Sequence, residues 1–261
     1  MRTAVSIPPF TDAATVVALA VEAEQAGWDG VFLWDHLVFH PETHPDVHDP
    51  WVLLGAMAQA TERVRLGTLV TPLARRRPWI VARHLVTLDH LSGGRATLGV
   101  GLGEPAGADF AAFGDPADPR ERAALLDDGL AVLDGLLRGP LAHHGPRFEV
   151  EAELRPRPVQ APRPPIWVAG VAPHRRPLAR ALRFDGIVPI GPGELLTPDQ
   201  LDDYLAGVDR PDGWDVVANW APGVAAGEYA AVGATWLVDG VWPTGDWVAD
   251  LRGRITAGPD G

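Results

Sequence analysis

Three side chains that can move protons follow short apolar runs in this sequence. Asp35 and His36 come directly after residues 31–34, and Glu104 closes a glycine-rich segment after residues 96–100. In parallel α/β proteins the carboxyl ends of the strands carry the binding and catalytic groups. Imidazole exchanges a proton near neutral pH, and a carboxyl group in a partly dry pocket can act as an acid. The pattern therefore predicts proton transfer at one edge of a parallel sheet.

Each of these groups also has a purely structural interpretation. His36 could be a hydrogen-bonded histidine inside the fold, and Glu104 could be an exposed loop carboxylate or a helix cap. Neighbouring strand residues face opposite ways, so Asp35 is expected to orient structure rather than react, unless the strand has already ended. The residue types alone leave both interpretations open.

The glycines before Glu104 remove side chains where a flat or phosphorylated ligand could approach the backbone. Gly101 and Gly103 follow the fourth predicted strand in the spacing GxGxE. A dinucleotide-binding loop normally follows the first strand, which here ends in two prolines and carries no glycine. We expect close approach of a flat ring, with tight strand-to-loop packing as the alternative.

The elements that would position these groups alternate regularly. Eight apolar runs are predicted strands, and most precede a helix: residues 2–7, 31–34, 64–69, 96–100, 166–169, 186–190, 214–219 and 234–238. Asp12, Asp49 and Thr197 are expected helix N-caps. Eight βα units in about 250 residues are what an α/β fold of the (β/α)8 TIM-barrel type needs. A doubly wound sheet is the alternative.

The predicted barrel is one domain over residues 1–261, with one interruption. Residues 140–165 are rich in proline and predict an excursion with a small hairpin. The net charge of −12 argues against nucleic acid and anionic membranes as partners. The sequence has neither cysteine nor lysine, which excludes thiolate sites, Schiff-base lysines and P-loop lysines. We expect a cytoplasmic protein, because no signal-peptide core or membrane-spanning run is present.

A polar loop contains five possible zinc ligands, namely His40, His44, Asp46, His48 and Asp49. Pro41 and Pro45 prevent a regular helix from presenting the histidines on one face. We therefore expect no metal and interpret the loop as a mobile lid.

Four segments resemble the bacterial luciferase-like flavin- and deazaflavin-dependent oxidoreductases, and they occur in the family's order. They are AVEAEQAGWDGVFLWDHL (20–37), DPWVLLGAMAQATERVRLGTLVTPLARRRP (49–78), ARHLVTLDHLSGGRATLGVGLGE (82–104) and RPVQAPRPPIWVAG (157–170). Together they cover roughly the first two thirds of the chain. The final third matches poorly and is shorter than we expect for the family.

The resemblance implies a TIM barrel, usually dimeric, that binds reduced FMN or coenzyme F420 at the carboxyl ends of the strands. It implies that FMN members add oxygen, whereas F420 members move a hydride to or from C5 of the deazaflavin. The Asp35–His36 pair and the compact length favour the F420 type, with a small organic substrate. His36 would then manage the proton, and Glu104 would lie near the deazaflavin ring.

Three other functions stay open. The first is an FMN-dependent monooxygenase supplied by a partner reductase; a flavin or F420 reductase is the expected electron source in either case. The second is a non-catalytic ligand-binding barrel, which the short final third motivates. The third, a metal-dependent hydrolase, is the weakest.

The resemblance also assigns positions at the cofactor, and Asp35 is one of the expected contacts. Thr68 and Leu69 end the third predicted strand, where the family often has a bulge and a non-prolyl cis peptide backing the ring. Arg75, Arg76 and Arg77 follow on the same rim and could meet an anionic cofactor tail. Surface salt bridges with nearby carboxylates are the alternative for these arginines.

The resemblance places the cofactor phosphate near the end of the fifth strand. Ala169, Gly170 and Val171 precede a basic helix that contains Arg175 and Arg176. Backbone N–H groups at a helix start bind phosphate, and arginine adds bidentate contacts. A solvated basic face is the alternative.

Overall fold

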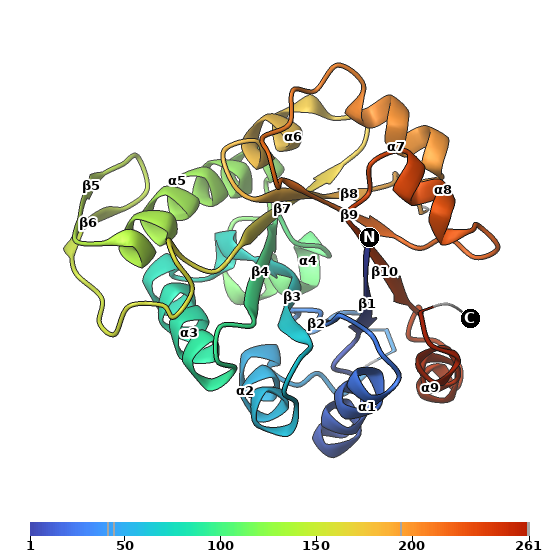
Figure 1. Ribbon diagram of the computed structural model, residues 1–261. Helices are drawn as coiled ribbons and strands as arrows, with labels where there is room; N and C mark the ends of the chain where they lie inside the picture. The colour runs from blue at the N-terminus through green and yellow to red at the C-terminus, as the bar shows by residue number, and fades with distance from the viewer. Residues whose placement is uncertain (41, 44, 194, 260–261) are drawn as a thin grey trace.

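The computed structural model describes residues 1–40, 42–43, 45–193 and 195–259. Eight parallel strands close into a barrel, in which β10 pairs with β1 (Figure 1). In barrel order they are β1 (Arg2–Ile7), β2 (Gly30–Leu33), β3 (Arg65–Pro72), β4 (Ala96–Gly101), β7 (Ile166–Val171), β8 (Gly186–Ile190), β9 (Asp215–Asn219) and β10 (Trp236–Gly240). The predicted TIM barrel is confirmed, and the doubly wound sheet is wrong.

Helices surround the strands, and most of the long ones lie in the first half. They are α1 (Ala13–Gln25), α2 (Pro50–Ala60), α3 (Pro78–Leu91) and α5 (Pro119–Arg138), against α6 (Arg175–Ala181), α7 (Pro198–Leu205), α8 (Ala226–Ala231) and α9 (Trp247–Ala257). Asp12, Asp49 and Thr197 accept hydrogen bonds from first-turn amides, as predicted. No helix in the described part of the chain is long and apolar enough to cross a membrane.

Three aromatic side chains fill one end of the barrel interior. Phe32, Trp167 and Trp236 pack with ring centroids 5.3–6.0 Å apart. Trp167 and Trp236 lie at the beginnings of β7 and β10, so this packing closes the amino-terminal end. Ligand binding and catalysis are therefore expected at the carboxyl-terminal end of the strands, as in other TIM barrels.

The predicted excursion is confirmed as an antiparallel hairpin that projects beside α5 (Figure 1). Its strands are β5 (Leu141–His144) and β6 (Glu149–Ala152). Asp128 of α5 holds the turn, because its carboxylate accepts from the amides of Arg147 and Phe148 at 2.8 and 2.7 Å. The same carboxylate lies 2.8 Å from the His143 ring.

Strand β3 is irregular at its carboxyl end. Its pairing with β4 shifts register between Thr68 and Thr71. The peptide bond between Leu69 and Val70 is cis. The resemblance implied both features for the end of the third strand, with an ordinary strand end as the alternative, and the structure contains both.

The short helix α4 (Ala106–Asp109) lies between β4 and α5. A 3-10 turn, η2 (Ala111–Phe113), follows it, and another, η1 (Leu73–Arg75), follows β3. Helix α4 directly follows β4, so it lies at the rim where the candidate side chains gather.

Candidate active site

His36 is joined to a carboxylate that lies far away in the sequence. Nδ1 of His36 lies 2.8 Å from Oδ2 of Asp109, at the end of α4. Oδ1 of Asp109 accepts hydrogen bonds from the amides of Leu37 and Val38 at 3.1 and 2.9 Å. The buried carboxylate therefore fixes both the ring and the backbone that follows it.

The electrostatics of this pair set the proton positions on the imidazole. Burial raises the pKa of Asp109, but hydrogen bonds from His36 and the Val38 and Leu37 amides outweigh it and hold the pKa below its usual value. An ionised carboxylate only accepts hydrogen bonds, so Nδ1 of His36 is the protonated nitrogen of the neutral ring. Nε2 is left with its lone pair, and it has no hydrogen-bond partner among the described residues. This arrangement suits a general base or, once protonated, a general acid.

An aromatic cluster surrounds His36. Phe10, Trp34 and Phe39 have ring centroids 6.0, 6.1 and 5.0 Å from the imidazole, respectively. Trp34 is oriented by its indole N–H, which donates to Ser6 at 2.7 Å. The His36 side chain keeps 17% of its surface exposed, so one side of the ring reaches the mouth of the barrel.

Asp35 belongs to a buried ionic network and does not line an open surface. Strand β2 ends at Leu33, and the carboxylate of Asp35 is completely buried. It accepts from Thr71 at 2.8 Å, from Arg75 at 2.8 Å and from Arg76 at 2.6 Å. The expectation that Asp35 orients structure agrees with these contacts.

The three arginines after β3 face different partners. Arg75 and Arg76 pair with Asp35, which agrees with the salt-bridge alternative. Arg77 lies over the ring of Trp79, with the guanidinium carbon 5.7 Å from the ring centroid. The first two cations are thus already neutralised within the protein.

Glu104 does not have the partly dry surroundings that an acid of raised pKa needs. Its side chain is 73% exposed and lies 3.0 Å from Arg122 of α5. Its other oxygen accepts from the amide of Ala106 at the start of α4 at 2.9 Å. The expectation of a dry pocket is corrected, because Glu104 caps a helix and pairs with a buried arginine.

The glycines at the end of β4 and just after it lie against protein rather than against open space. A Cβ on Gly101 would come 2.8 Å from Val70 and 3.4 Å from Ala169. At Gly103, whose φ is +80°, a Cβ would come 2.5 Å from Pro72 and 2.9 Å from Phe110. The tight-packing alternative accounts for both positions.

The predicted phosphate region lies at the end of β7, the strand that pairs with β4. Ala169 is buried and Val171 is exposed, while a Cβ on Gly170 would come 2.6 Å from Pro177. Arg175 donates to the carbonyl oxygen of Tyr204 at 2.6 Å, whereas Arg176 is exposed. Thr68 and Leu69, expected at the cofactor ring, lie on β3 facing β4, and Thr68 donates to the carbonyl of Gly99 at 3.2 Å.

No cluster of three metal-ligating side chains occurs among the residues that the structure describes. His40 pairs with Glu42 at 2.7 Å, and Asp49 caps α2. His44, which belonged to the proposed zinc set, lies outside the described residues.

The rest of the rim is apolar. Exposed large apolar side chains end or follow β2, β7, β8 and β10, namely Leu37, Val171, Ile190, Leu195 and Trp242. Exposed apolar side chains that gather in one patch are typical of ligand-binding grooves or protein interfaces. The barrel mouth is thus suited to a flat, partly apolar molecule.

Comparison with known proteins places this barrel in a family. The family described as luciferase-like monooxygenase matches residues 1–232. The chain belongs to this family. Among solved structures, monooxygenase RslO1 from Streptomyces bottropensis covers 84% of this chain and 70% of its own, with a TM-score of 0.70 and 25% identity. An F420-dependent secondary alcohol dehydrogenase in complex with an F420–acetone adduct covers 97% of both chains, with a TM-score of 0.77 and 18% identity, which shows the luciferase-like fold.

Two curated relatives carry different activities in their names. The F420-dependent glucose-6-phosphate dehydrogenase of Beutenbergia cavernae is 38% identical over 204 residues, covering 76% of this chain and 59% of that protein. The 4-hydroxyprotoasukamycin monooxygenase of Streptomyces nodosus is 35% identical over 193 residues, covering 72% of this chain and 49% of that protein. The luciferase-like barrel thus spans about half to three fifths of the length of these relatives.

Asp109 and Trp242 are the rim residues that sequence reasoning missed. Asp109 lies 73 positions from His36, in a four-residue helix too short to show a periodic pattern. Trp242 follows β10 in the segment with the weakest resemblance. An ionisable residue shortly after the glycine-rich loop was the one available signal for Asp109.

Proposed function

We propose that the chain is an F420-dependent oxidoreductase that transfers a hydride between C5 of the deazaflavin and a small organic substrate. The observation that carries the proposal is the His36–Asp109 pair at the barrel mouth. Membership in the luciferase-like family and the F420-dependent relatives support the cofactor. Reduced deazaflavin supplies two electrons as a hydride, and that chemistry needs a neighbouring group for the proton.

The residues of the mouth fit a flat ring. Exposed apolar side chains at the ends of β7 and β8, Val171 and Ile190, offer surface that a ring would cover. Gly101 and Gly103 let Val70, Ala169, Pro72 and Phe110 pack closely at the β4 side of the mouth. Thr68 and Leu69 on β3 and the rim residues Ala169 to Val171 stay our candidates for cofactor contact, with Arg176 as the exposed cation beside them.

Each protein group then has a defined task. Nε2 of His36 takes the proton from a substrate hydroxyl, or returns it to a carbonyl oxygen. Asp109 keeps the proton on Nδ1 and stabilises the imidazolium once it forms. Phe10, Trp34 and Phe39 exclude water around the ring, which strengthens these electrostatic effects.

Cofactor titration tests the proposal. Tryptophan fluorescence should change at micromolar F420, and oxidised F420 should lose its visible absorbance when substrate is supplied. Binding of FMN without binding of F420 contradicts the proposal. It would favour the second candidate, an FMN-dependent monooxygenase with a reductase partner, which the 4-hydroxyprotoasukamycin monooxygenase relative supports. Oxygen uptake with reduced FMN would distinguish that case.

We also infer a homodimer. Exposed Val52 on α2 and Ile80 on the neighbouring helix α3 place apolar surface outside the barrel. Light scattering during gel filtration should give twice the 27.9 kDa chain mass. Introducing charge with Val52→Asp should shift the mass to that of a monomer, whereas a monomeric parent protein contradicts the inference.

A further inference from the structure

A surface groove lies between α9 and the loops that follow β8, β9 and β10. It consists of two adjoining cavities of about 260 and 530 Å³, which share Trp220, Pro222 and Arg254. This α9 groove is defined by Leu195, Trp220, Pro222, Trp242, Asp250 and Arg254. The larger cavity has a volume typical of small-molecule sites.

The α9 groove is separate from the proposed reaction centre. His36 lines neither cavity. Trp242 lies between the two places, with its ring centroid 5.6 Å from those of both Trp34 and Phe39. Those two rings in turn pack against the imidazole. A ligand in the α9 groove would therefore be one aromatic layer away from the proton acceptor, so the groove is not a place for the reacting group.

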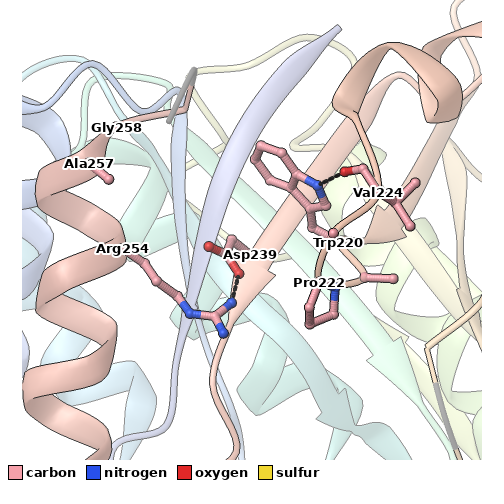
Figure 2. A pocket seen from close by; sticks show the side chains of 9 residues that line it. Trp220, Pro222, Val224, Asp239, Arg254, Ala257 and Gly258 are labelled. Carbon is pink, nitrogen blue, oxygen red and sulfur yellow. Dashed lines mark hydrogen bonds and ion pairs between the residues drawn. The ribbon is translucent and has the colours of Figure 1, made fainter.

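The charged side chains of the groove leave one negative charge over. Arg254 is the one cation among the described residues that line it, and its Nη1 donates to Asp239 at 2.7 Å. Figure 2 shows Arg254 reaching from α9 toward Asp239, opposite Trp220. Asp250 lines the larger cavity and has no hydrogen-bond or ion-pair partner in the described part of the chain. Its place in the first turn of α9 suits the helix dipole, but the dipole provides no counter-ion.

Two indole rings line the groove, and no cation of the described chain lies over either of them. Each guanidinium that lies over an aromatic ring lies over a different one, and the sequence contains no lysine. Trp242 is 60% exposed, and the N–H of Trp220 is used by the carbonyl oxygen of Val224 at 2.8 Å. Indole faces attract cations more strongly than other aromatic rings do, and quaternary ammonium groups are typical ligands of such faces.

We propose that the α9 groove binds a small organic cation, a quaternary ammonium group on an apolar body, at a site separate from the reaction centre. The ammonium would lie between the Asp250 carboxylate and the indole faces, and the body would cover Leu195 and Pro222. An anion would instead have to displace Asp239 from Arg254 and would face a second carboxylate. A neutral molecule would make the apolar contacts but leave the charge of Asp250 unpaired. The proposal does not depend on the F420-dependent function.

The first test compares three benzyl compounds of similar size, namely benzyltrimethylammonium, benzyl alcohol and phenylmethanesulfonate. Isothermal titration calorimetry is carried out on the full chain in about 0.15 M salt, which screens the long-range attraction of cations to a chain of net charge −12. We expect the Kd of the ammonium compound to be lower than both others by about tenfold or more. Equal or tighter binding of either comparison compound overturns the proposal, as does a lack of ammonium binding at about 10 mM.

The second test removes the unpaired charge. Asp250→Asn should raise the Kd of benzyltrimethylammonium about fivefold, because one close charge is lost at a solvated site. Asp199→Asn is the matched control, since it changes another exposed first-turn aspartate, on α7, that lines neither cavity. It should leave the Kd within about twofold. Equal effects of the two variants would show attraction to the overall charge of the chain and would overturn the proposal.

A third measurement locates the cation by NMR. The indole N–H signals of Trp220 and Trp242, assigned from Trp→Phe variants, should shift on addition of benzyltrimethylammonium, whereas the signal of the buried Trp28 should not. Shifts confined to other tryptophans contradict the assignment to the α9 groove.

The fourth test separates the groove from the barrel mouth. His36→Ala should leave the Kd of benzyltrimethylammonium within about twofold of the parent value, because His36 does not line the groove. A rise as large as that of Asp250→Asn would place the cation at the mouth and overturn the separate site. A fluorescence titration with F420 on the same samples tests the cofactor assignment independently, so the two failures are distinguishable.

Discussion

The rim from β1 to β4 is held by buried ionic contacts, whereas the rim from β7 to β10 is apolar and contains the pockets. In the first half, Asp35 joins two arginines and Asp109 joins His36 to the backbone. In the second half, Val171, Ile190 and Trp242 stand exposed above helices of 6–11 residues. Side chains held by buried ion pairs suit a reaction step that needs a constant geometry. Exposed apolar rim residues can change without disturbing the scaffold, so they suit the binding of different ligands.

The largest effect is expected from His36→Ala in the first half. Removing the proton acceptor should lower kcat by about 10²- to 10⁴-fold, while the F420 dissociation constant stays within about threefold. Stopped-flow absorbance and fluorescence titration measure the two quantities. His40→Ala is the matched control, because this neighbouring histidine pairs with Glu42 and not with Asp109. A His36→Ala variant with more than a tenth of parental kcat would show that the proton moves by another route.

Asp35→Asn should give the largest loss of stability. It leaves Arg75 and Arg76 buried without their anion, which costs about 3–5 kcal/mol of unfolding free energy. Urea unfolding followed by tryptophan fluorescence measures the loss. Asp49→Asn is the control, since Asp49 is 47% exposed, lies 3.6 Å from Arg76 and keeps a capping side chain. Equal losses in the two variants would contradict the contrast between buried and exposed pairs.

Asp109→Asn tests the hydrogen bond between His36, which follows β2, and Asp109, which follows β4. The amide can donate to Nδ1 and so favour the wrong imidazole tautomer, which should lower kcat by about 10²-fold. Retention of full activity would make Asp109 purely structural.

Asp109→Asn should also change how the unfolding free energy depends on pH in acid. The pKa of Asp109 lies below its ordinary value of 3.8, so its contribution to stability is present above that pH and is lost as pH falls through the folded-state pKa. The difference in unfolding free energy between parent and variant should shrink as the pH falls below about 4. A difference that grows in acid would contradict this sign.

Strand order and helix starts were predictable because they depend on local patterns. Asp12, Asp49 and Thr197 cap helices as their types predict, and apolar runs alternate with helical stripes. The exposed position of Glu104 and its ion pair were not predictable, because they depend on Arg122, 18 positions away on α5. The same holds for the His36–Asp109 contact, which only the closed barrel brings together.

A smaller effect is expected in the second half from Trp242→Ala. Removing an aromatic side chain that packs against the cluster around His36 should raise the substrate KM about tenfold and leave kcat within about threefold, because binding rather than proton transfer is weakened. Steady-state kinetics separate the two parameters. Val159→Ala, another exposed apolar residue that lies near Gly94 before β4, should change neither. A fall in kcat as large as that of His36→Ala would contradict the assignment of proton transfer to the first half and substrate binding to the second.

The smallest effect should come from Glu104→Gln, and it separates two roles for a carboxylate at the same rim. If Glu104 only caps α4 and pairs with Arg122, kcat should change less than about twofold and unfolding free energy by less than about 1 kcal/mol, since exposed pairs contribute little. A fall in kcat of about 10²-fold would instead make it a second proton-transfer group. The F420-bound enzyme would then have to bury a side chain that is 73% exposed in the structure. Measuring kcat for Glu104→Gln beside Asp109→Asn therefore tests whether burial of a carboxylate, rather than its position after β4, decides which one serves the chemistry.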